Sequence, residues 1–392
     1  MGRYRRSVVR LLVIVVCLAA MVWTVHSLGP EKVWESLQRA DPLWLGLAVA
    51  AVIARFLIWG IKWQAMLRRR EQVPLGQCVS FVMAGAFANL TTPSAKLAGG
   101  VVRAVLLSRR RGWPPLEAYG WALADQATNI LGQWLLFGVL AMAAYFGLPP
   151  GPLRTGLPIA GMIVTVSVIA FGMLRVRLWA LVERQTIGRW IARWMPARFR
   201  KDRSAEVYND WLERILRPTL KQGGMTSAFL PDVVLGAFGF SMLCASNAMV
   251  LRALGSDAPL VLVSVAVMLG YFAGTLVGAW GGIGVTEAAL TGLFVQIGIP
   301  LEMAATGALL HRAVFYLVGF AGGGPAVARG LRKSVATGNE LEKPEIVRTT
   351  ALGLIDVPRS ASGGEHLLGE VRAIATGDTV ALNRPDEPHD FV

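Results

Sequence analysis

The sequence predicts an all-α polytopic membrane protein, with about six full transmembrane helices and two oppositely oriented re-entrant helical hairpins in an inverted repeat. Three observations predict this class: the hydrophobic composition, the placement of basic residues and two interrupted apolar segments. Hydrophobic residues make up 54% of the 392 residues, charged residues only 16%, and the mean hydropathy is +0.51. A soluble domain carries about 25% charged residues. Soluble, disordered, collagen-like and coiled-coil proteins are therefore excluded.

The net charge of +14 indicates topology and not a nucleic-acid partner. Cytoplasmic loops of membrane proteins collect Lys and Arg. Most of the positive charge falls in four blocks, at Arg3–Arg10, Arg68–Arg70, Arg109–Arg111 and Arg175–Arg217. We therefore expect each block to lie on the cytoplasmic side of a bacterial inner membrane, with both termini cytoplasmic.

Uninterrupted apolar runs of about 20 residues predict the full spans. These runs are Leu11–Leu28, Leu43–Leu67, Trp121–Phe146, Thr155–Leu174, Phe229–Leu254 and Met303–Phe320. The first run follows four arginines, as a signal peptide would, but Val25-His26-Ser27-Leu28 offers no small-x-small cleavage site. We interpret it as an uncleaved anchor.

Two further apolar segments are interrupted by helix-breaking residues. Cys78–Leu107 contains Thr91-Thr92-Pro93-Ser94 and Gly99-Gly100, and basic blocks flank both of its ends, which predicts a hairpin that enters from the cytoplasm and returns to it. Leu260–Ile297 is broken at 278–284, and it must begin and end outside if the chain after Met303–Phe320 is cytoplasmic. Non-helical backbone at membrane depth is tolerated only where it is buried in protein or lines a polar cavity.

The interrupted segments resemble each other. Residues 82–88 and 267–273 are identical at five of seven positions, and 100–106 and 284–290 at four of seven. Opposed broken helices in corresponding halves are typical of inverted-repeat transporters, whose substrate site lies near the midplane. The predicted repeat units are 43–146 and 229–320. The alternative is a passive bundle with two glycine-rich packing kinks.

Charged residues inside predicted spans are costly and usually mark a function or a pair. The candidates are Arg55, Lys96, Arg103, Asp125, Glu287, His311 and Arg312. Arg103 and Glu287 occupy equivalent positions in the two repeat units. Asp125 and His311 also correspond, along the third element of each unit. Arg103 and Glu287 form a central pair in one interpretation, and in another present a cation and an acid to substrate.

Other polar positions have less specific interpretations. Glu287 alone has two interpretations: it caps a helix or forms a structural pair, or it takes part in transport. The turn containing Gly282 and Gly284 leads into a helix N-terminus, which suits a phosphate. Arg55 is expected to snorkel or to pair with Asp125. Asn89, like Asn129, is by default a hydrogen-bonding contact between helices.

The remaining features exclude several site classes. Three cysteines and four histidines lack disulfide or zinc spacing, and no catalytic or cofactor motif is present. The cytoplasmic loop 176–224 interleaves basic residues with tryptophans between Arg184 and Arg217, which is typical of a helix on an anionic membrane surface and equally of a solvated connector. The acidic tail, 334–392, is expected to be largely disordered and cytoplasmic, beyond a transmembrane domain at 1–333.

At the hairpins the sequence resembles the lysylphosphatidylglycerol synthase transmembrane (flippase) family, the membrane portion of multiple peptide resistance factor. The segment Gly281–Leu290 and His311-Arg312 carry the resemblance in the second half. In the first half it rests on Lys62-Trp63 and on Asn89, Pro93, Lys96, Gly99-Gly100 and Arg103-Ala104. Trp280 and Thr286 depart from the family pattern, which usually has Pro and Arg there, and Asp125-Gln126 replaces an acid-Arg pair.

The resemblance implies movement of a lipid or a lipid-linked group between leaflets. The residues support the same class, with Arg103 and Arg312 meeting a head-group phosphate and Glu287 and Asp125 setting the charge balance or coupling to protons. Because only about sixty residues follow Lys333, we expect no aminoacyltransferase activity from this chain, and a separate synthase or transferase as a partner. The alternative is a non-transporting scaffold for envelope lipid or glycolipid synthesis.

Overall fold

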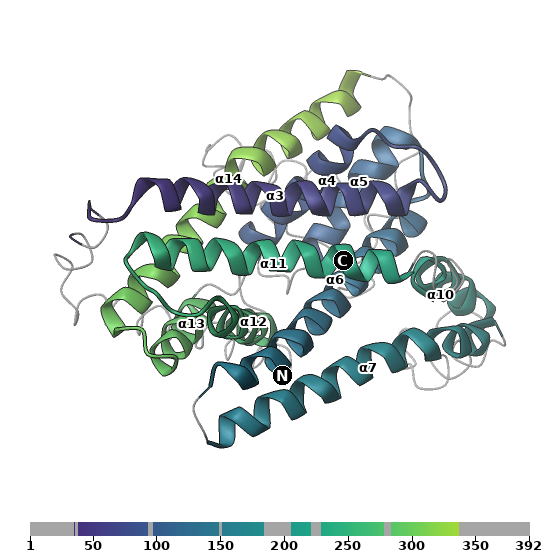
Figure 1. The fold of residues 1–392 in the computed structure, drawn as a ribbon. Helices are drawn as coiled ribbons and strands as arrows, with labels where there is room; N and C mark the ends of the chain where they lie inside the picture. Colours follow the sequence, from purple (N-terminus) through teal and green to yellow (C-terminus); the bar gives the residue numbers. More distant parts are fainter. Residues whose placement is uncertain are drawn as a thin grey trace, which may run out of the picture. The chain divides into compact units, whose positions relative to one another are not determined.

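A computed structural model of the chain describes residues 35, 38–92, 97–148, 151–183, 205–220, 229–277 and 284–336. Every regular element in these ranges is a helix (Figure 1). The chain divides into Met1–Asn339 and Glu340–Val392, and all described residues belong to the first unit. The predicted first span and nearly all of the predicted tail lie outside the described ranges.

The helices follow the predicted order. They are α3 (Pro42–Leu67), α4 (Leu75–Thr91), α5 (Leu97–Arg111), α6 (Pro115–Ala143), the short 3₁₀ helix η1 (Ala144–Phe146), α7 (Pro152–Glu183), α10 (Ala205–Leu220), α11 (Phe229–Ala253), α12 (Leu260–Val277), α13 (Val285–Gln296) and α14 (Leu301–Ala336). Five of them have segments long and apolar enough to cross a membrane, namely Pro42–Leu67, Pro115–Phe146, Arg154–Arg175, Phe229–Ala253 and Leu301–Arg329. This confirms the predicted all-helical membrane class.

Local sequence signals set several helix ends. The Asp41 carboxylate accepts a hydrogen bond of 2.8 Å from the Leu43 backbone N–H, and Pro42 occupies the first turn of α3, where its missing N–H costs nothing. Arg109, Arg110 and Arg111 fill the last turn of α5, where cations complement the helix dipole. Gly284 precedes α13 with φ of +81°, a conformation that glycine adopts without strain.

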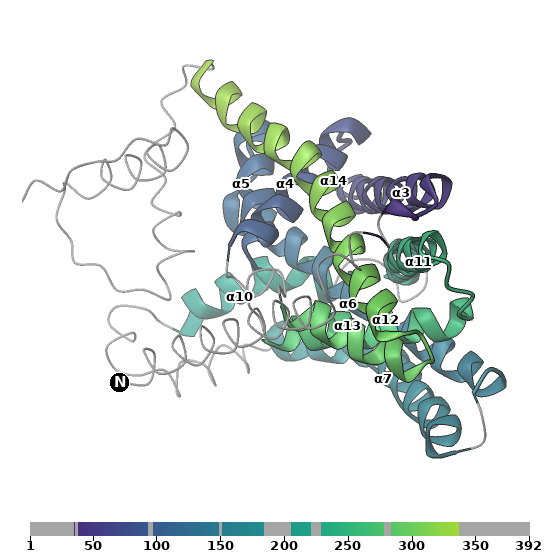
Figure 2. The ribbon, with the colours of Figure 1, turned by 90° about the vertical axis from the view of Figure 1, so that its left-hand side faces the viewer.

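The two interrupted segments each form a pair of short helices. Helices α4 and α5 pack against each other, as do α12 and α13 (Figure 2). Helices α3 and α11 lie side by side (Figure 1), and α3 contacts α4 of one pair while α11 contacts α12 of the other. The neighbours correspond: α4 contacts α3, α5 and α14, while α12 contacts α11, α13 and α6.

The last helix is longer than its predicted span. The last span was expected to end at Phe320, but α14 continues to Ala336 through Gly322–Gly324 and Pro325. The glycines allow this, because a Cβ at Gly323 would lie 2.6 Å from the Met83 carbonyl oxygen of α4. Inside the predicted loop 176–224 lie the end of α7 and the whole of α10, which packs on α6 and α7 through Leu212 and Ile215. A helix was one of the two interpretations of this loop.

Glycine sets the crossing of α6 and α11, which holds the helix carrying Asp125. A Cβ at Gly132 would lie 2.5 Å from both the Ala237 nitrogen and the Val233 oxygen, which are backbone atoms and cannot rotate away. We expect Gly132→Ala to destabilise the protein by about 1–3 kcal/mol, as overpacking does. Thermal unfolding in detergent measures the change. Gly46→Ala is the control, since a Cβ there meets no atom within 4 Å, and equal melting temperatures for the two variants would contradict the prediction.

Candidate functional site: two buried ionic clusters

One carboxylate and two cations from three helices meet in the first half of the chain. Lys62 of α3 places Nζ 3.0 Å from Oδ1 of Asp125 on α6, and Arg103 of α5 places Nη1 2.5 Å from Oδ2 of the same carboxylate. Lys62 also donates to the Asn129 side-chain oxygen at 2.8 Å, and Asn129 Nδ2 donates to Asp125 Oδ2 at 3.2 Å. We call Lys62, Arg103, Asp125 and Asn129 the inner cluster.

The inner cluster is buried and carries excess positive charge. The Lys62 side chain is 0% exposed, and those of Asp125 and Arg103 are 3% and 8% exposed. The Arg103 guanidinium carbon also lies 5.0 Å from the Trp63 ring centre, which contributes a cation–π interaction. Two cations share one carboxylate, so the formal charge of the cluster is +1 when all three groups are ionised. A bound anion would compensate that charge.

A second ion pair lies in the other half. Arg312 of α14 donates from Nε to Glu287 Oε1 of α13 at 2.6 Å, and from Nη2 to the Tyr316 hydroxyl at 2.7 Å. Tyr271 of α12 places its hydroxyl 3.5 Å from His311 Nδ1, and the ring of His311 is fully buried. We call Tyr271, Glu287, His311, Arg312 and Tyr316 the outer cluster.

The two clusters have opposite polarity. In the first half the cation Arg103 is on the second helix of the pair and the carboxylate Asp125 on the helix that follows. In the second half the carboxylate Glu287 is on the second helix and the cation Arg312 on the next. The interpretation of Arg103 and Glu287 as partners in a central pair is therefore wrong, because each pairs within its own half.

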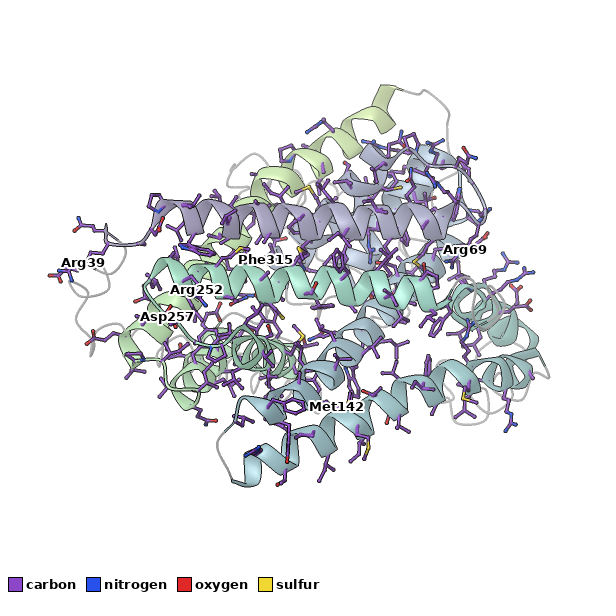
Figure 3. The ribbon with its side chains drawn as sticks, viewed as in Figure 1. Arg39, Arg69, Met142, Arg252, Asp257 and Phe315 are labelled. Atoms are coloured by element: carbon purple, nitrogen blue, oxygen red, sulfur yellow. The ribbon has the colours of Figure 1, made fainter. Side chains whose placement is uncertain are left out.

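Arg55 does not pair with Asp125, contrary to that expectation. Its guanidinium carbon lies 4.2 Å from the ring centre of Trp59, 5.3 Å from that of Phe240 and 5.2 Å from that of Phe315. Figure 3 shows Phe315 in the layer where α3 and α11 run side by side. Lys62, seven residues further along α3, forms the pair with Asp125 that was expected of Arg55.

Lys62 was not singled out as a site residue, although its position carried a signal. It lies two helical turns after Arg55, so the two side chains share a face of the helix. Tyr271 and Tyr316 were also missed. Tyr316 follows Arg312 by four residues, which places the phenol next to the guanidinium, whereas no sequence pattern brings Tyr271 to His311.

The remaining predicted residues have different placements. Asn89 accepts a hydrogen bond of 2.7 Å from the Gly99 backbone N–H, so it ties α4 to α5. Gly284 immediately precedes α13, whose first turn contains Glu287. Lys96 and Gly282 lie outside the described residues. No group of three metal-ligating side chains occurs in the ranges that the structure describes.

Comparison with known proteins identifies the family. The family described as the lysylphosphatidylglycerol synthase TM region matches residues 7–323. The chain belongs to this family. It is also similar to a UPF0104 membrane protein of Pyrococcus horikoshii, 20% identical over 318 residues that cover 79% of this chain and 93% of the relative. A UPF0104 membrane protein of Methanothermobacter thermautotrophicus is 22% identical over 317 residues, covering 77% and 89%.

Both ionic clusters fall inside the part of the chain that matches the lysylphosphatidylglycerol synthase TM region. The matched residues, 7–323, contain Lys62, Asp125, Glu287 and Arg312. They also contain both helix pairs, α4 with α5 and α12 with α13. The membrane region of this family is thus the part of the chain that builds the candidate site.

Proposed function

We propose that this chain is a lipid transporter that moves an anionic or lipid-linked head group between the leaflets of a bacterial inner membrane. The observation that carries the proposal is the excess positive charge of the inner cluster, where Lys62 and Arg103 share Asp125 out of contact with water. Isolated charge inside a membrane protein is expensive and marks substrate or ion pathways. A phosphate head group supplies the missing negative charge, so we propose transport and not catalysis.

The packing of the helices supports an inverted repeat with two re-entrant hairpins. Helices α3 to α6 and α11 to α14 make corresponding contacts, and the break in α4–α5 corresponds to the break in α12–α13. Basic residues flank both ends of the α4–α5 pair, from Arg68–Arg70 to Arg109–Arg111, so this pair enters from and returns to the cytoplasm. The α12–α13 pair then enters from the other face.

The clusters lie at similar depths from opposite faces. Asp125 is ten residues from the start of α6 and Arg312 eleven residues from the start of α14, or about 15 Å along each axis at 1.5 Å per residue. In the proposed topology α6 starts in the cytoplasm and α14 starts outside. Both clusters therefore lie near the middle of a hydrocarbon core about 30 Å thick, with the proposed cavity forming between the hairpins.

Helix α10 supports contact with the cytoplasmic membrane surface. Leu212 and Ile215 are buried against the protein, while Asp210, Arg214 and Arg217 are exposed on the same short helix. We propose that this exposed face meets anionic lipid, with a separate synthase or transferase supplying the transported lipid.

Reconstitution with fluorescent phosphatidylglycerol tests the proposed function. Arg103→Met leaves Lys62 paired one-to-one with Asp125, so we expect a folded protein that moves the probe at least tenfold more slowly than the unmodified chain. Loss of outer-leaflet probe to a membrane-impermeant quencher measures transport. Arg252→Met is the control, because Arg252 pairs with the exposed Asp257 at the far end of α11 from Arg69 (Figure 3).

Two results would contradict the proposal. Probe movement in the unmodified chain no faster than in empty vesicles would exclude lipid transport, and unmodified speed in the Arg103→Met variant would separate transport from the inner cluster.

A further inference from the structure

Arg55 is a buried arginine in the middle of α3, and no carboxylate of the described residues forms an ion pair with it. It lies thirteen residues from Pro42 and twelve from Leu67, about 20 Å along the helix from either end. Only 5% of its surface is exposed. Its Nε and Nη1 atoms are fully buried and make no hydrogen bond, and no ion pair involves Arg55, in the part of the chain described.

Aromatic rings alone do not account for a guanidinium at this depth. The rings of Trp59, Phe240 and Phe315 surround it at 4.2–5.3 Å. A desolvated cation–π contact contributes about 2 kcal/mol, whereas burying an ion costs several kcal/mol and leaves its N–H donors unsatisfied. The arrangement leaves hydrogen-bonding capacity unused on a permanently charged group.

The electrostatic surroundings of Arg55 are positive. Its charged and polarisable neighbours are Arg312, Tyr271 and Cys244, and both arginines act on His311. Glu287 Oε1 is already held by Arg312 at 2.6 Å. Counting Arg55, Arg312 and Glu287, the region carries one uncompensated positive charge. A ligand with one negative charge balances it, and a dianion overbalances it.

We propose that Arg55 binds the phosphodiester group of the transported lipid beside the outer cluster. This inference rests on the proposed function and names the substrate class, a head group with a single phosphodiester charge. Guanidinium donors match phosphate oxygens in geometry, and water exclusion strengthens the bond. The Trp59, Phe240 and Phe315 rings supply an apolar wall while the head group passes.

Native mass spectrometry of the purified full chain in detergent tests the inference. The probes are phosphatidylglycerol, phosphatidylcholine, phosphatidic acid and inorganic phosphate. We expect the unmodified chain to retain phosphatidylglycerol at least tenfold better than the other two lipids, and Arg55→Met to lose that preference. Arg55→Lys keeps a charge but not the fork of donors, so its preference is expected to be intermediate. Arg252→Met is expected to behave as the unmodified chain.

A second readout separates ligand binding from a structural role. A ligand that binds only the folded chain raises its melting temperature. We expect phosphatidylglycerol to raise the melting temperature of the unmodified chain and to leave the melting temperature of Arg55→Met unchanged. This holds even if Arg55→Met without lipid is more stable than the unmodified chain. Equal stabilisation of both proteins, or an unchanged lipid preference, would overturn the inference.

The remaining outcomes distinguish the ligand source and the two proposals. If inorganic phosphate displaced phosphatidylglycerol from the unmodified chain but not from Arg55→Met, the Arg55 site would be supported, and soluble phosphate would be shown to reach it. If Arg55→Met lost neither binding nor transport while the unmodified chain moved lipid, the Arg55 site would be wrong and the proposed function would stand. If lipid binding depended on Arg55 but the unmodified chain moved no lipid, the proposed function would be wrong and the Arg55 binding site would stand.

Discussion

Replacing Asp125 with asparagine is expected to destabilise the protein more than any other single change to the inner cluster. Asparagine keeps the size and hydrogen-bonding capacity of aspartate but leaves the Lys62 ammonium and the Arg103 guanidinium, both buried, with no carboxylate between them. Removing one partner of a buried pair costs about 3–5 kcal/mol. The melting temperature in detergent is expected to fall by about 10 °C.

Two further variants isolate charge balance as the cause. Lys62→Met with the native Asp125 leaves the Arg103 pair intact at 2.5 Å, so it is expected to cost much less than Asp125→Asn. Adding Lys62→Met to Asp125→Asn removes one of the two uncompensated cations and is expected to recover part of the lost stability. A melting temperature for Asp125→Asn equal to that of the unmodified chain would show that the carboxylate does not compensate these cations.

The fold was largely predictable because membrane insertion acts on local sequence. Each full span inside the described ranges was located from hydropathy, and the Leu43–Leu67 run differs from α3 by one residue at its start. Pro93 marked the first interruption and glycines marked the second, whereas Gly99 and Gly100, which were also taken as an interruption, lie inside α5. The apolar run Met303–Phe320 did not locate the end of α14, which continues through Gly322–Gly324 to Ala336. In the structure the missing side chains of these glycines admit Met83 and Phe87 of α4.

The charged residues were predictable as a set, but their partners were not. A buried charge can be found from hydropathy, whereas its partner depends on how neighbouring helices cross. The crossing that brings Lys62 to Asp125 depends on close approaches such as that of Gly132 to α11, which no pairwise sequence pattern encodes. The sequence similarity of the two segments also misled: Arg103 and Glu287 align with each other, but each pairs with a residue of its own half, Arg103 with Asp125 and Glu287 with Arg312.

Exchanging the charges of the outer cluster is expected to preserve the fold and abolish transport. In the double variant Glu287→Arg, Arg312→Glu, an arginine on α13 faces a carboxylate on α14, and the Tyr316 hydroxyl donates to that carboxylate where it now accepts from Arg312. Each single variant places two like charges together in a buried site and is expected to lose about 3–5 kcal/mol. The double variant is expected to recover most of that loss in thermal unfolding.

Transport is expected to respond differently from stability because Arg312 is an electrostatic neighbour of Arg55. A glutamate at 312 offers Arg55 an internal carboxylate that competes with the lipid phosphodiester for its guanidinium, although the net charge of the region stays at +1. Movement of fluorescent phosphatidylglycerol in vesicles is therefore expected to fall at least tenfold. The matched control exchanges the exposed pair, Arg252→Asp with Asp257→Arg, which should leave both stability and transport unchanged. Unmodified transport in the buried double variant would mean that the opposite polarity of the clusters plays no part in moving lipid.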